Sequence, residues 1–77
     1  MTPKEFAHAC DVLGLSNSDV ALMTGNTIRA VQFWRNGRSP IPQSVALILD
    51  AMECGRLDMD WVIDWVSTNQ THVKEMH

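Results

Sequence analysis

The stretch from Asn17 to Asn36 decides the fold, and it reads NSDVALMTGNTIRAVQFWRN. Its pattern predicts two short helices joined by a tight turn. Ala21 lies four positions before Gly25, where two crossing helices would be pushed apart by a larger side chain. Gly25 can adopt the left-handed conformation that ends a helix. Thr27 can then cap the next helix by accepting a backbone N–H bond.

The second helix of this stretch has one apolar face. Val31 and Trp34 are three residues apart, so they are expected to point into the core together with Ala30. Two helices joined in this way form a helix-turn-helix, whose second helix enters the major groove of DNA. The alternative interpretation is an ordinary helical hairpin without a role in DNA binding.

The stretch resembles the lambda-repressor-like, or Cro-type, helix-turn-helix regulators without a gap at Ala21, Gly25, Thr27, Val31 and Trp34. The segment that follows, NGRSPIP from Asn36 to Pro42, is similar to small phage-borne regulators, including anti-CRISPR-associated repressors. The resemblance covers about residues 5 to 53. It implies a lambda-repressor-like fold and a transcriptional regulator, most simply a repressor, encoded by a phage or another mobile element.

Two positions depart from the pattern of the resembled family. Thr24 and Asn26 stand where that family usually has apolar residues beside the turn glycine. We therefore expect either a less well packed turn, or Leu22 and Met23 packing in their place.

Helix start and stop signals predict an all-α domain of five helices. Thr2 with Glu5, Ser16 with Asp19, Thr27, Pro42 and Asp58 are the expected starts, and the expected ends are Gly14, Thr24, Asn36, Gly55 and Val66. The remaining core is expected from Phe6, Ala9, Cys10, Leu13, Val45, Ile48, Leu49 and Met52. In this interpretation residues 1–66 form the DNA-binding domain, about 58–66 form a dimerisation helix, and 67–77 form a flexible polar tail.

Charge is distributed unevenly along the chain. The net charge is −3, yet the segment 28–42 holds three arginines and no acidic residue. From Asp50 onward there are six acidic residues and two cations. Because the docking face and not the sum decides affinity, this pattern permits a nucleic-acid partner. No apolar run could span a membrane and no signal-peptide pattern opens the chain, so we expect a cytoplasmic protein with Cys10 and Cys54 as buried thiols.

The exposed face of the third helix is expected to read DNA bases. Arginine suits guanine and glutamine suits adenine, which makes Arg29 and Gln32 the strongest candidates. The predicted base-reading residues are Arg29, Gln32, Ile28, Phe33 and Asn36, and those predicted to contact the DNA backbone are Asn17, Ser18, Thr27, Arg35, Arg38 and Ser39. Phe33 could equally be a half-buried ring, and Arg35 could pair with an acidic residue on the surface.

The predicted fifth helix is unusually apolar for its length. We expect a homodimer interface formed by Trp61, Val62, Trp65 and Val66, because exposed tryptophan usually marks an interface. The alternative is that this helix folds back and closes the core of the monomer.

The preferred function is a homodimeric DNA-binding regulator. In its simplest form it is an autorepressor that binds an inverted repeat and thereby blocks a promoter. The alternative is a protein-interaction module, antitoxin-like or an adaptor, that uses the acidic, tryptophan-rich end. Asp60 and Asp64 with His8, His72 and His77 do not form a metal-binding or catalytic pattern. We therefore expect neither an enzyme nor a cofactor or metal.

Overall fold

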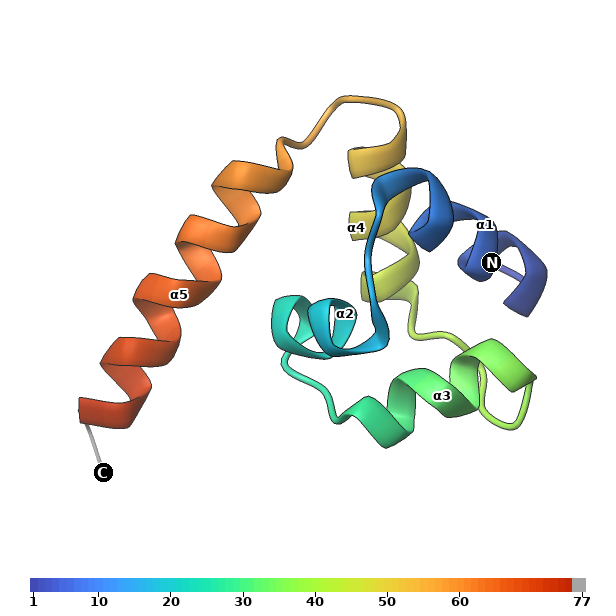
Figure 1. Cartoon of the computed structure of the whole chain (residues 1–77), viewed down its shortest axis with the longest axis horizontal. Coiled ribbons are helices and arrows are strands. Elements are labelled where there is room, and N and C mark those ends of the chain that lie inside the picture. Colours follow the sequence, from blue (N-terminus) through green and yellow to red (C-terminus); the bar gives the residue numbers. More distant parts are fainter. Residues whose placement is uncertain (76–77) are drawn as a thin grey trace.

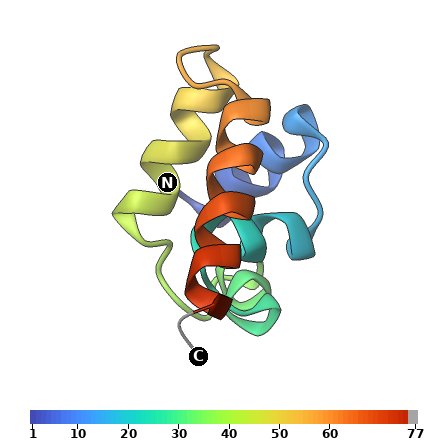
Figure 2. The ribbon, with the colours of Figure 1, turned by 90° about the vertical axis from the view of Figure 1, so that its left-hand side faces the viewer.

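The computed structural model describes residues 1–75, and side chains through Asn69. Within this range the chain is all-α, with five helices: α1 (Pro3–Leu13), α2 (Asn17–Thr24), α3 (Ile28–Asn36), α4 (Gln43–Glu53) and α5 (Met59–Glu75). α1 packs against α4 and α3, while α2 packs against α3 and α5 (Figure 1). The view in which α5 faces the reader shows this helix running in front of the other four (Figure 2).

The predicted helix starts are confirmed at four N-termini, including that of α5, where Asp58 Oδ1 accepts from Asp60 N–H at 2.8 Å. Thr2 and Glu5 form a capping box, in which Thr2 N–H donates to Glu5 Oε1 at 2.8 Å and Glu5 N–H donates to Thr2 Oγ1 at 3.1 Å. Ser16 and Asp19 repeat this arrangement at α2. Thr27 Oγ1 accepts from Ala30 N–H at 3.1 Å at the start of α3. Each bond satisfies a backbone group that the helix itself leaves without a partner.

The core is formed by the apolar stripes that the sequence predicts. Its buried members include Phe6, Ala9, Cys10, Val31, Trp34, Val45, Leu49 and Met52, while Leu13, Ala30 and Ile48 are partly buried around them. The rings of Phe6 and Trp34 meet edge to face, with centroids 6.0 Å apart and an interplanar angle of 84°. This aromatic pair joins α1 to α3 and thereby holds α3 from its buried side.

Hydrogen bonds hold the turn between α2 and α3. Gly25 has φ +70°, the left-handed conformation that the sequence predicts. Thr24 Oγ1 donates to Val20 O at 2.7 Å, and Asn26 Nδ2 donates to Thr24 Oγ1 at 3.0 Å. The two polar residues beside the turn glycine, Thr24 and Asn26, therefore stabilise the turn directly. Of the two expected packing substitutes, Met23 is buried, whereas Leu22 is 45% exposed.

Three sequence-based expectations are corrected. α5 does not end near Val66 but continues to Glu75, since no glycine or proline interrupts it and each added residue gains a backbone hydrogen bond. Residues 76 and 77 of the predicted tail lie outside the described part of the chain. Cys54 is exposed at the end of α4, and Pro42 precedes the first helical residue instead of being it. None of the helices in the described range is long and apolar enough to cross a membrane.

Candidate nucleic-acid interface

α3 presents a polar face to solvent. Its opposite face is anchored by Val31, which is fully buried, and by Trp34. Arg29, Gln32 and Asn36 are spaced at i, i+3 and i+7, so the helical repeat brings all three to one side, where each is exposed. The predicted base-reading residues of this helix therefore share a face.

Phe33 and Ile28 border this polar face. The guanidinium carbon of Arg29 lies 5.5 Å from the centroid of the Phe33 ring, within the range of a cation–π contact. Phe33 is half-buried, and its ring supports the Arg29 side chain. Ile28 is nearly half exposed at the first turn.

The loop after α3 places a second arginine beside this face. The backbone N–H of Arg38 donates to Phe33 O at 2.9 Å and to Asn36 Oδ1 at 3.1 Å, which fixes the loop against the end of α3. The Arg38 side chain is exposed and Ser39 is half-buried. Ser18 is exposed at the start of α2.

Arg35 is occupied by a partner that the sequence did not suggest. Its Nε donates to Asn17 Oδ1 of α2, and its guanidinium carbon lies 5.5 Å from the centroid of the Phe6 ring of α1. The side chain therefore joins three helices. Among the residues whose side chains are described, Arg35 forms no ion pair with an acidic side chain. Both residues of its hydrogen bond to Asn17 had been predicted to contact phosphates. Because Asn17 and Arg35 are 18 positions apart, no local pattern in the sequence could reveal the pair.

The residues predicted to form a dimer interface divide into two groups. Val62 and Val66 are each only 5% exposed and belong to the core of the chain itself, so they are not free to contact a second copy. This burial is what the alternative interpretation of the fifth helix predicted. Trp61 and Trp65 remain 59% and 54% exposed. The interface prediction is thus corrected for the valines and stays a prediction for the tryptophans.

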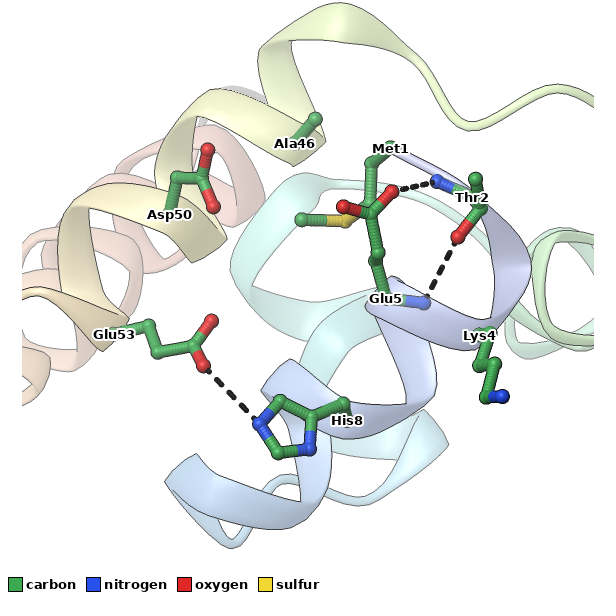
Figure 3. Close-up of a pocket in the computed structure, with 8 residues that line it drawn as sticks. All are labelled: Met1, Thr2, Lys4, Glu5, His8, Ala46, Asp50 and Glu53. Carbon is green, nitrogen blue, oxygen red and sulfur yellow. Dashed lines mark hydrogen bonds and ion pairs between the residues drawn. The ribbon is translucent and has the colours of Figure 1, made fainter.

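A hollow of about 570 Å³ lies between α1 and α4, away from the polar face of α3 (Figure 3). Glu5, Asp50 and Glu53 line it, and His8 Nε2 lies 3.7 Å from Glu53 Oε1. The hydrogen bond from the Thr2 backbone N–H lowers the pKa of Glu5, so this carboxylate already serves the cap of α1. Among the described residues no group of three candidate ligands could hold a metal ion.

No family model matches this chain, and neither the curated proteins nor the solved structures contain a match to it. The functional inference therefore rests on the chemistry and placement of its own side chains.

Proposed function

We propose that the chain is a sequence-specific, double-stranded DNA-binding transcriptional regulator. In this proposal α2 and α3 act as a lambda-repressor-like helix-turn-helix, and α3 enters the major groove. Arg29 and Gln32 read base edges, with Ile28, Phe33 and Asn36 beside them. Thr27, Ser18, Arg38 and Ser39 contact the DNA backbone.

The observation that carries the proposal is the exposed face of α3. An α-helix with its side chains is about 10–12 Å in diameter, so α3 fits the major groove, which is about 12 Å wide. Arg29 and Gln32 are exposed side by side on it, and both side chains can bind a base with two hydrogen bonds. Val31 and Trp34 hold the other face in the core, so these side chains project from a rigid support.

The charge distribution also supports docking of this face of α3 against DNA. The segment 28–42 contains three arginines and no acidic residue, and two of them, Arg29 and Arg38, have exposed side chains. Because phosphate neutralisation releases counterions, a small number of cations supports modest nonspecific binding whose strength falls with salt. Discrimination between sequences would then depend on Arg29 and Gln32.

The proposed output is repression by two copies bound to an inverted repeat. In helix-turn-helix dimers the half-sites lie about one helical turn of DNA, or a multiple of it, apart. The DNA itself can bring two copies together, so this part of the proposal does not depend on which protein surface joins them.

The test begins with selection of a preferred duplex from a random pool. Arg29→Ala should weaken binding to the selected duplex by about 1–3 kcal/mol per half-site and bind scrambled duplex almost normally, because a base contact is lost. Arg38→Ala should weaken binding to both duplexes by similar factors and lower the salt slope by about one unit per half-site, because a phosphate contact is lost. Circular dichroism of both variants controls for the fold.

Selection that enriches no sequence, or two variants that bind every duplex as the wild type does, would refute the proposal. The inverse pattern, with Arg38→Ala losing only the selected duplex, would show that the roles of helix and loop are exchanged.

A second candidate function is a protein-interaction module. It is favoured by the two exposed tryptophans of α5, since large exposed apolar side chains commonly mark a binding surface.

A further inference from the structure

One exposed stripe of α5 combines two indole rings with a carboxylate. Trp61, Asp64, Trp65 and Thr68 are spaced at i, i+3, i+4 and i+7, and all four are exposed. Val62 and Val66 point into the core, so the stripe lies on one flank of the buried face and Ile63 on the other. More than half of the surface of each tryptophan is therefore in solvent.

The carboxylate of Asp64 has no cationic partner within the described part of the chain. The ion pair described there joins His8 to Glu53, and residues 59–69 contain no lysine or arginine. Asp64 lies three positions after Trp61, so the two residues are neighbours on the surface of the helix. Asp58 and Asp60 add further negative charge at the start of the same helix.

This combination matches the chemistry of an arginine side chain. A guanidinium group is attracted to the face of an aromatic ring, and tryptophan is the strongest such partner. Its planar set of N–H donors also matches a carboxylate. One arginine can therefore stack on an indole ring and donate to Asp64 at the same time.

A second copy of the chain fits the stripe less well. Two-fold pairing of this face would bring the Asp64 carboxylates of both copies into one apolar contact, and residues 59–69 offer no lysine or arginine to neutralise them. Charged residues are depleted in the centres of interfaces because an unpaired buried charge is costly. The negative charge of the same face also disfavours contact with DNA.

We propose that the Trp61–Asp64–Trp65–Thr68 stripe docks an arginine-bearing segment of a partner protein. The guanidinium lies against an indole ring and donates to the Asp64 carboxylate. The stripe and the polar face of α3 lie on different helices, with α5 and α3 on separate sides of α2 (Figure 1). Docking of the partner therefore goes beyond the proposed DNA-binding function and does not require it.

The experiment titrates the whole chain, without DNA, with a labelled alanine-based peptide that carries arginines four residues apart. A peptide with glutamine in place of arginine is the control. Indole N–H resonances of Trp61 and Trp65 should shift, while that of the buried Trp34 should not. Asp64→Asn should weaken binding about fivefold or more, and Trp65→Ala by a similar factor, since each removes one of the two contacts.

Two matched variants separate the stripe from general effects. Asp11→Asn changes the net charge as Asp64→Asn does but lies on α1, and Ile63→Ala removes an exposed apolar side chain from the other flank of α5. Both should retain binding within about twofold. All four substitutions are at exposed positions, and circular dichroism confirms the fold of each variant.

Equal losses for Asp11→Asn and Asp64→Asn would overturn the proposal, because general attraction between opposite charges would then explain binding. Unshifted Trp61 and Trp65 resonances would also overturn it. Sedimentation tests the remaining alternative. If it shows a dimer, and if the double variant Trp61→Ala, Trp65→Ala is a monomer, the stripe is occupied by a second copy of the chain.

Discussion

Replacing Arg35 with alanine tests whether this side chain is structural or free to hold a phosphate. Arg35→Ala removes the hydrogen bond to Asn17 Oδ1 and the cation–π contact with Phe6. The side chain is half-buried, so we take about 1 kcal/mol for the bond and about 0.5–1 kcal/mol for the ring contact, or about 2 kcal/mol in all. For a chain of this size that corresponds to a fall in melting temperature of about 8–16 °C.

Thermal and urea unfolding followed by circular dichroism measure this loss. Arg38→Ala is the matched control: its side chain is exposed, so the free energy of unfolding should change by less than about 0.5 kcal/mol. A double-mutant cycle of Arg35→Ala with Asn17→Ala should give a coupling of about 1 kcal/mol. If Arg35→Ala is as stable as Arg38→Ala, the three-helix contact contributes nothing and Arg35 is available to DNA as the sequence suggested.

Three further predictions concern stability and reactivity. Gly25→Val should destabilise the fold by about 1–2 kcal/mol, because the φ of +70° strains a branched residue even though space for a Cβ is open. Gly25→Asn should destabilise the fold less, because asparagine tolerates this conformation better. Equal melting temperatures for both variants and the wild type would show that the backbone at Gly25 imposes no strain. In a thiol-labelling time course Cys54 should react rapidly, whereas Cys10 should react only on unfolding, because Cys10 is fully buried and burial raises its pKa. The variant Cys54→Ser should show the slow phase alone. Fast labelling of that variant would contradict the burial of Cys10. The hydrogen bond from Thr2 lowers the pKa of Glu5, so its stabilisation is present above the ordinary glutamate pKa and is lost as the pH falls through the lowered value. Glu5→Gln should make the free energy of unfolding depend less on pH in the acid range, whereas Asp11→Asn should not. Identical acid unfolding curves for Glu5→Gln and the wild type would show that Glu5 contributes no pH-dependent stability.

Much of the candidate site could be predicted because it depends on one helix. Once Val31 and Trp34 are assigned to the core, the helical repeat alone places Arg29, Gln32 and Asn36 on the opposite face. Arg35 could not be assigned in this way. A long side chain beside the buried face can reach solvent or a neighbouring helix, and the position of α2 and α1 decides which.

The sequence by itself determined the features that arise within about one helical turn. The Thr2–Glu5 and Ser16–Asp19 capping boxes and the left-handed turn at Gly25 join residues at most four positions apart, so local chemistry specifies them. The tertiary structure decided which helix covers which apolar face. Val62 and Trp61 are neighbours of similar apolar character, yet packing of α5 against α2 buries the valine and leaves the indole in solvent. A helical repeat shows which residues share a face, but only the docking of the helices determines which face loses its contact with water.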